Sequence, residues 1–529
     1  MIVRNWLLCG AAVAALAGSP ATAQTMSAED AALLRAQIDA LRAQVEALEA
    51  RLDAVQAAPV ADPAPSPAPS IAVAASPAPA SPAPPQINTA WRGAPEFSGE
   101  GGWSFKPRGR FLVDTGNVSA PDGIEATTRN LGYNTRVRRV RLGFEGTVPG
   151  GFGYKVETDL SNSSVGFGDV WITYAPSPEW LVRLGNFEPL NGMEQISSSN
   201  FVTTLERASF NEAFLNNRRL GAAVGWYDSG DELRVDVGLF ANHAIDSSLD
   251  NAGWQASARA TWAPAIGNGR LHLGGSIQFR EFAANNGGVA NTSGGAFAVN
   301  QLARYRARPG SVLTDVRFVD TASFAASSDR IIGLEAAVIF PGVYAAGEMQ
   351  WLSANAYAPG GRASGLDAFT NGNTAITPAG NPTFSGGYAE IGWFITGESR
   401  GYGKGLWQRT RVRNPVHRGG SGAWQLAMRY DWLDLTDANL TGASTTDFAT
   451  GNTSLAAVNS RLGRGGSQET LSFAINWQPV DYVRLMLDWN HAMIEGGPLA
   501  ALARPTSTDP INQRSYSVDT VAARMQIDF

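Results

Sequence analysis

The sequence is short of several residues on which other classes of protein depend. Its single cysteine, Cys9, lies in a segment expected to be removed, so we expect a mature chain without a thiol or a disulfide. Lysine occurs only at Lys106, Lys155 and Lys404, although lysine and arginine together number 41. No run of about 18 apolar residues follows the N-terminus, which argues against a membrane-spanning helix. The mild net charge of −6 does not indicate nucleic-acid binding.

Residues with catalytic or metal-binding chemistry are also sparse. The 4 histidines are scattered without the spacing of metal ligands. Neither a nucleophile elbow nor a His-Glu-x-x-His motif occurs. We therefore expect no enzyme activity, no metal and no cofactor.

The N-terminal part of the chain contains two segments with distinct sequence patterns. Residues 1–23 are typical of a signal peptide, with Arg4 before an apolar stretch and small residues at the cleavage site. Residues 24–57 are predicted to form a coiled-coil helix, because apolar residues recur about every 3.5 positions. An amphipathic helix packed on its own domain is the alternative. The apolar positions are Leu34, Ile38, Leu41, Val45, Leu48, Leu52 and Val55.

Residues 58–102 are predicted to form a Pro/Ala-rich linker. Such a composition cannot pack a core, and a polyproline segment rises about 3.1 Å per residue, so the linker could span several tens of Å. We expect this N-terminal segment to lie in the periplasm, where it could contact the cell wall.

Residues 103–529 are predicted to form an all-β domain, a 16-stranded antiparallel transmembrane β-barrel. Segments of about ten residues alternate apolar and polar side chains and are separated by turn residues. An even number of strands is what a closed bacterial barrel needs. The sixteen segments are 103–116, 133–147, 153–163, 167–176, 179–187, 217–228, 232–243, 252–264, 269–282, 329–341, 343–355, 385–397, 422–435, 467–479, 481–494 and 514–529.

The connections between these segments indicate an outer-membrane protein. Short turns such as Pro341-Gly342 alternate with long links such as 188–216, and the last strand ends in the aromatic Phe529. The link 398–421 departs from this alternation, because it is long and basic where a short turn is expected. We predict that the chain lies in the outer membrane of a Gram-negative bacterium, in contact with lipid and lipopolysaccharide.

The strand 136–145 is unusually rich in arginine. Read with a period of two, Val140 and Leu142 share one face, and Arg139 and Arg141 share the other. A charge facing lipid near the midplane costs roughly 2–4 kcal/mol, so the arginine face is expected to line the lumen. For any single arginine, pairing with an acidic residue across the wall is the alternative. By parity alone Arg138 points outward. The same parity places Lys106, Arg108, Arg110 and Lys155 in the lumen.

The link 188–216 is predicted to fold into the lumen as a constriction loop, with a mobile surface loop as the alternative. Its polar residues include Gln195, Ser198, Ser199 and Asn200.

Several stretches resemble the phosphate-selective porin O and P family, in the family's order across about 103–529. The resemblance implies a homotrimer of barrels, each with its own pore, which admits anions along a track of arginines. It implies that Arg110, Arg138, Arg139 and Arg207 bind anions. The similar stretches include Lys106-Pro107-Arg108-Gly109-Arg110, Arg138-Arg139 with Gly143-Phe144, Tyr154-Lys155, Val182-Arg183-Leu184-Gly185, Ser198-Ser199 with Leu205-Glu206-Arg207, and Arg429-Tyr430-Asp431.

The chain departs from the family at the loop that faces this track. Gln195 and Asn200 stand where the family's phosphate-binding members carry lysines, and Gly168 stands at an acidic position, with Asp169 beside it. We therefore predict a porin that passively admits small inorganic or organic anions, with phosphate as one candidate. The alternatives are a general or organic-solute porin, and a structural tether between the outer membrane and the cell wall.

Overall fold

The computed structural model describes residues 87–126, 130–161, 165–214, 216–242, 245, 253–282, 302–322, 324–356, 380–440 and 465–529. The expected signal peptide, the expected coiled coil and the expected linker up to residue 86 lie outside these residues. No helix in the described ranges is long and apolar enough to cross a membrane.

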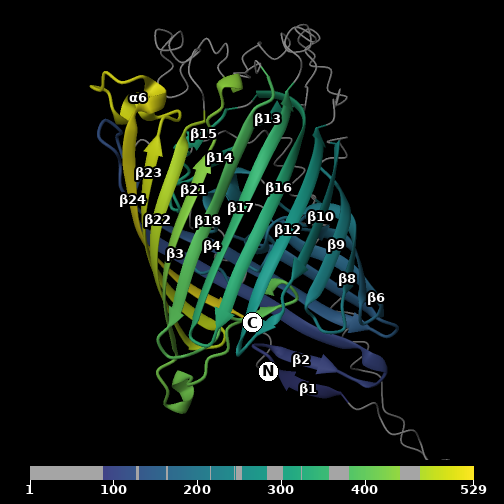
Figure 1. Cartoon of the computed structure of the whole chain (residues 1–529). Helices are drawn as coiled ribbons and strands as arrows, with labels where there is room; N and C mark the ends of the chain where they lie inside the picture. Colours follow the sequence, from purple (N-terminus) through teal and green to yellow (C-terminus); the bar gives the residue numbers. More distant parts are fainter. Residues whose placement is uncertain are drawn as a thin grey trace, which may run out of the picture. The chain divides into compact units, whose positions relative to one another are not determined.

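In the described part of the chain, sixteen strands form one closed antiparallel ring, which confirms the predicted barrel (Figure 1). The ring closes because the last strand pairs with the first, with Gly116 opposite Ala522 and Asp114 opposite Arg524. The strands of the ring are β3 (Ser104–Val118), β4 (Gly132–Val148), β5 (Phe152–Asp159), β6 (Gly166–Ser177), β7 (Trp180–Phe187), β8 (Arg219–Tyr227), β9 (Leu233–Ala241), β10 (Gly253–Trp262), β12 (Gly269–Phe282), β16 (Phe324–Phe340), β17 (Val343–Ala356), β18 (Thr383–Phe394), β21 (Ala423–Asp434), β22 (Ser467–Val480), β23 (Val483–Glu495) and β24 (Ser515–Asp528).

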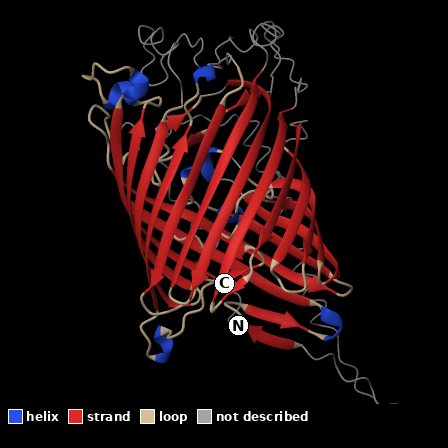
Figure 2. Ribbon diagram, in the orientation of Figure 1, coloured by secondary structure: helices blue, strands red, loops and turns tan. Residues whose placement is uncertain are grey.

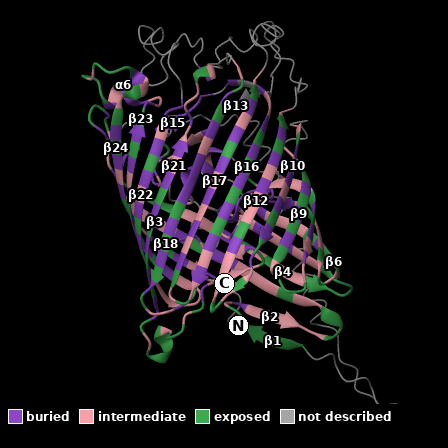
Figure 3. Cartoon of the chain, viewed as in Figure 1, coloured by how far each residue is buried: buried purple, intermediate pink, exposed green. Residues whose placement is uncertain are grey.

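Alternation along each strand decides which side chains face outward (Figure 3). On β9, Val235, Val237 and Leu239 are exposed on the outer wall, whereas Arg234 and Asp236 are buried inside. An apolar outer band meets lipid and the inner face carries the polar groups, as in other transmembrane barrels.

Shorter elements lie between the barrel strands or before them. The strands are β1 (Asn88–Trp91), β2 (Pro95–Ser98), β11 (Ala265–Ile266), β13 (Leu302–Ala303), β14 (Arg306–Ala307), β15 (Val319–Asp320), β19 (Tyr402–Gly403) and β20 (Leu406–Trp407). The helices are α2 (Met193–Ile196), α3 (Ser209–Ala213) and α6 (Ala500–Ala503), with 3-10 turns η2 (Glu100–Gly102), η4 (Val416–Arg418), η5 (Ala438–Leu440) and η6 (Ile511–Gln513).

Strands β1 and β2 form a hairpin that the sequence analysis did not identify. β2 pairs with the start of β3, with Phe97 opposite Phe105. The turn between β1 and β2 contains Gly93 at φ +87°, a conformation that favours glycine. Two strands of 4 residues are too short to show a period of two, which explains why the pattern was missed.

The link between β7 and β8, residues 188–218, folds into the barrel and is called the lumen loop below (Figure 2). It carries α2 and α3 and touches strands on opposite parts of the ring. Ser276 of β12 donates to Asn191 at 2.7 Å, and the backbone N–H of Leu205 donates to Asp488 of β23 at 2.6 Å. The loop therefore divides the lumen.

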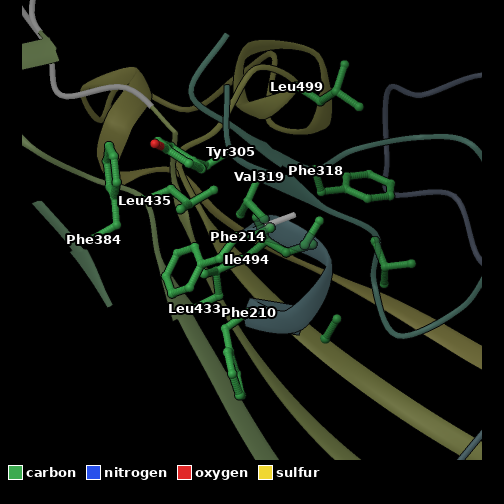
Figure 4. Packing of buried hydrophobic residues seen from close by; sticks show 14 of the residues in the cluster. Phe210, Phe214, Tyr305, Phe318, Val319, Phe384, Leu433, Leu435, Ile494 and Leu499 are labelled. Atoms are coloured by element: carbon green, nitrogen blue, oxygen red, sulfur yellow. The ribbon is translucent and has the colours of Figure 1, made fainter. Parts of the chain in front are cut away.

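An apolar cluster fills the lumen on the side of the long loops, here called the loop rim (Figure 4). The ring of Phe210 in α3 stacks against Tyr388 of β18, with centroids 6.4 Å apart. Tyr305, from the link between β12 and β16, packs edge-on against Phe214. On this side of the barrel, the lumen beside β16–β24 is therefore filled by side chains. Other members of the cluster include Phe318, Val319, Phe324, Phe384, Leu433, Leu435, Ile494 and Leu499.

The long basic link 398–421 also enters the barrel, from the opposite rim, here called the turn rim. The backbone N–H of Trp407 donates to Ser197 Oγ at 3.0 Å, which joins this basic segment to the lumen loop. Arg259 on the wall donates to the carbonyl of Gly405 at 2.7 Å. The open space that remains lies beside β3–β9.

Candidate anion pore

A β-bulge in β4 places two consecutive arginines inside the barrel. Leu112 of β3 lies opposite Arg139, and Val113 lies opposite Val137, so Arg138 is an extra residue without a partner in the ladder. In a regular strand the side chain of Arg138 would point outward. The bulge turns this side chain to the inside of the barrel. The structure therefore brings the side chains of both arginines to the lumen loop.

Arg138 is neutralised by an acidic residue of the lumen loop. Its guanidinium makes a two-point contact with Glu206 at 2.9 and 3.0 Å, and Arg524 of β24 reaches the same carboxylate at 2.8 Å. Burial alone would raise the pKa of Glu206, but Arg138 and Arg524 hold this pKa well below its ordinary value. Glu206 is therefore ionised, and its charge offsets part of the basic charge at this level.

Four other predicted basic residues, which lie on β3, β4 and β5, also have acidic partners. Pairing across the wall, which was the alternative for single arginines, therefore applies to them. The pairs are Arg108 with Glu145 (2.5 Å), Arg110 with Glu157 (3.1 Å), Arg141 with Glu157 and Asp159 (2.7 Å each), and Lys155 with Asp169 (2.6 Å).

Arg139 and Arg207 differ from these residues. Within the described residues neither makes an ion pair. Arg139 donates to Ser199 Oγ, and it lies near other arginines. Arg207 donates to the backbone carbonyls of Glu194 at 2.9 Å and Ser197 at 2.8 Å. Two guanidinium groups at the lumen loop thus have no ion-pair partner among the described residues.

Two cavities meet at this pair of arginines. The outer chamber, of about 290 Å³, lies toward the loop rim, between Arg138 of β4 and residues 308–312. The inner chamber, of about 640 Å³, opens toward the turn rim along β3–β9. Arg139 and Arg207 line both chambers, and they are the only described residues that do so. Two cations without an ion pair therefore lie at the boundary between the two chambers.

The remaining predicted residues occupy different parts of the pore. Gln195 lines the outer chamber, with its amide donating to the carbonyl of Asn216 at 2.9 Å. Ser198 and Ser199 line the inner chamber. Asn200 is buried against the wall, where its backbone carbonyl accepts hydrogen bonds from the side chains of Gln526 and Arg484. It lines neither chamber. Lys106 lines the inner chamber and donates to the carbonyl of Arg92 at 2.8 Å.

The basic residues of the inner chamber that the sequence did not indicate as pore residues include Arg183, Arg218 and Arg409. Parity along β7 places Arg183 on the same face as Leu181, so alternation could have found it. Arg218 lies just before β8 and pairs with Asp169 at 2.6 Å. Arg409 belongs to the basic segment, which has no periodicity from which its position could be inferred.

No group of three or more His, Cys, Asp or Glu residues with the geometry of a metal site occurs in the part of the chain that the structure describes.

Comparison with known proteins identifies a family. A family model described as phosphate-selective porin O and P matches residues 105–529. An uncharacterized protein of Caulobacter vibrioides is 34% identical over 539 aligned residues, which cover 98% of this chain and 94% of that protein. Porin O of Pseudomonas aeruginosa is 26% identical over 404 residues, which cover 72% of this chain and 81% of the relative.

Solved structures of outer-membrane channels are also similar, at low sequence identity. The outer membrane channel DcaP of Acinetobacter baumannii is 11% identical, with a TM-score of 0.43, over 81% of this chain and 98% of that chain. An anion-selective porin from Comamonas acidovorans is 13% identical, with a TM-score of 0.42, over 81% of this chain and 100% of that chain.

Proposed function

Because the chain belongs to the phosphate-selective porin O and P family and is an outer-membrane porin, we propose that its pore passively admits small anions. The observation that carries the proposal is the position of Arg139 and Arg207. They lie at the boundary between the two chambers, which is the proposed passage, and make no ion pair within the described ranges.

Electrostatics favours an anion at this passage. At an effective dielectric constant near 20, one unit charge attracts another at 4 Å by about 4 kcal/mol. Two unpaired guanidinium groups would hold a single anion, and an anion must also be able to leave. The paired basic residues of β3–β5 form weaker anion-binding positions on the turn-rim side, because a neighbouring carboxylate offsets the charge of each of them.

We propose general anion passage rather than strict selectivity for phosphate. Gln195 supplies a neutral amide, and Asn200 is directed to the wall, so neither adds a cation at the constriction. Phosphate then has no lysine cluster to distinguish it from other anions. We expect phosphate and sulfate to inhibit the chloride current at similar concentrations.

Planar-bilayer recordings test the proposed function. In a potassium chloride gradient, the reversal potential should show preference for chloride, and Arg139→Ala and Arg207→Ala should each reduce this preference. The matched control is Arg504→Gln, which removes an exposed arginine that lines neither chamber. A preference for potassium, or the absence of any conductance, would overturn the proposal.

We also propose that residues 24–57 form a coiled coil that supports a homotrimer of barrels, with the Pro/Ala-rich residues after it as a periplasmic spacer. The repeat of apolar residues from Leu34 to Val55 supports the coiled coil, which fits two or three strands, and the resemblance to the family supports three copies. Deleting residues 27–86 should lower the temperature at which trimers dissociate on a gel. If trimer stability and envelope integrity are both unchanged in this deletion variant, the proposal is contradicted.

A further inference from the structure

The two chambers have different linings, although both are basic. Among the residues that line the outer chamber, Val312 is the only one with an apolar side chain larger than a methyl group. The inner chamber is lined by apolar and aromatic side chains as well as by cations. A hydrated inorganic anion gains nothing from an apolar wall. The apolar lining residues are Trp171, Leu181, Phe187, Leu190, Ile196, Phe201, Leu406, Tyr227 and Tyr482.

Arg183 stands out within this lining. Its guanidinium lies over the rings of Trp171 and Phe187, at 5.1 and 5.2 Å from their centroids. It makes no ion pair with another residue of the described chain, and its Nε is buried without a hydrogen-bond partner. A cation over two rings that makes no ion pair is suited to a planar acid group.

Lys404 is a second cation of the inner chamber that makes no ion pair within the described residues. It occupies the turn between β19 and β20 with φ +52°, and Gly405 follows with φ +70°, so the turn resembles the type I′ geometry of tight hairpins. Arg234 fixes the turn by donating to the carbonyl of Lys404 at 2.6 Å. The amine of Lys404 lies 5.2 Å from the ring centroid of Tyr227. The hairpin therefore holds a free amine against an aromatic wall.

We propose that Arg183, Lys404 and the rings of Trp171, Phe187 and Tyr227 form a binding site for aromatic carboxylates in the inner chamber. The carboxylate pairs with the guanidinium and the amine, and the aryl ring packs on the apolar wall. The volume of about 640 Å³ leaves room for a single-ring acid. This inference rests on the proposed function and names one class of anion that the pore takes.

Inhibition of the chloride current tests this site, with benzoate as the probe and acetate as the reference. For the full-length wild-type porin in a bilayer, we expect half-inhibition by benzoate at a concentration about tenfold below that for acetate. Cyclohexanecarboxylate, which has the same charge and no aromatic ring, should lie between them. Equal half-inhibition by benzoate and acetate would overturn the proposal.

Variants locate the site. Trp171→Leu keeps an apolar side chain and removes the ring, so the tenfold difference should fall to about threefold or less. Arg183→Gln should weaken benzoate binding by about tenfold, and Lys404→Gln gives a second measurement if Arg183→Gln does not fold. The matched control is Phe473→Leu, which removes a ring from the lipid-facing wall outside the chamber, and it should retain the difference. A benzoate preference that survives in all three site variants would overturn the assignment.

The two proposals fail in different ways. Chloride preference with no advantage for benzoate would reject the aromatic site and leave the anion pore intact. Cation preference would reject the anion pore itself.

Discussion

Arg138 and Arg139 are consecutive in the chain, yet both side chains reach the lumen loop, where Arg138 binds Glu206 and Arg139 donates to Ser199. In a regular strand one of them would face lipid. The bulge at Arg138 removes this conflict and gives the two residues different roles. Arg138 is neutralised by a carboxylate, and Arg139 keeps its charge for the pore.

The first prediction concerns the pair of Arg138 and Glu206. Arg138→Ala should lower the ratio of chloride to potassium permeability several-fold, because the carboxylate of Glu206 loses one of its two cations at the constriction. The double variant Arg138→Ala with Glu206→Gln should recover most of the wild-type ratio, since the uncompensated negative charge is then gone. Reversal potentials in a salt gradient measure both effects. Additive losses in the double variant would contradict this account.

The second prediction is the pH dependence of Glu206. Its pKa in the folded protein lies below the ordinary value, so its ion pairs stabilise the docked lumen loop at neutral pH and are lost only as pH falls through that lowered pKa. An unperturbed glutamate is about half protonated near pH 4.3. The difference in reversal potential between the wild type and Glu206→Gln should therefore persist from about pH 7 to about pH 4. A fall of this difference to about half near pH 4.3 would show an ordinary carboxyl.

The sequence reveals the barrel wall more fully than it reveals the inside of the pore. The barrel strands could be predicted because lipid outside and water inside impose a period of two, as in Val235, Val237 and Leu239 of β9. The inward position of Arg138 could not be derived from parity, because a bulge of one residue changes parity without a local composition signal. The resemblance to the family did place it in the pore.

Other parts of the pore lack any regular pattern. The basic segment enters the lumen through isolated contacts, such as the backbone N–H of Trp407 with Ser197, and no period of two or 3.6 marks it. The free charge of Arg139 and Arg207 is likewise a property of three-dimensional pairing. Counting basic and acidic residues on strands cannot reveal which of them remain unpaired.

The third prediction concerns the apolar cluster that fixes the lumen loop at the loop rim. Phe210 is fully buried against Tyr388. In soluble proteins, replacing a buried Phe by Ala lowers the free energy of unfolding by roughly 3–5 kcal/mol. Phe210→Ala should loosen the loop, so we expect larger and noisier single-channel currents. The control is Phe473→Ala, which removes an equal side chain from the lipid-facing wall and should leave the current amplitude unchanged. Identical currents in both variants would mean that the cluster does not restrain the pore.

The fourth prediction separates the width of the pore from its selectivity. Trp407 of β20 is buried against Tyr344 on the barrel wall, with ring centroids 5.7 Å apart, and it holds the β19–β20 hairpin in the lumen. Trp407→Ala removes this anchor, so the hairpin should dock less often and single-channel conductance should rise. Arg139 and Arg207 are untouched by the change, so the preference for chloride should stay within about twofold of the wild-type value. If conductance rises and the chloride preference is lost together, the basic segment contributes to selectivity directly, and the two unpaired arginines are not sufficient to set it.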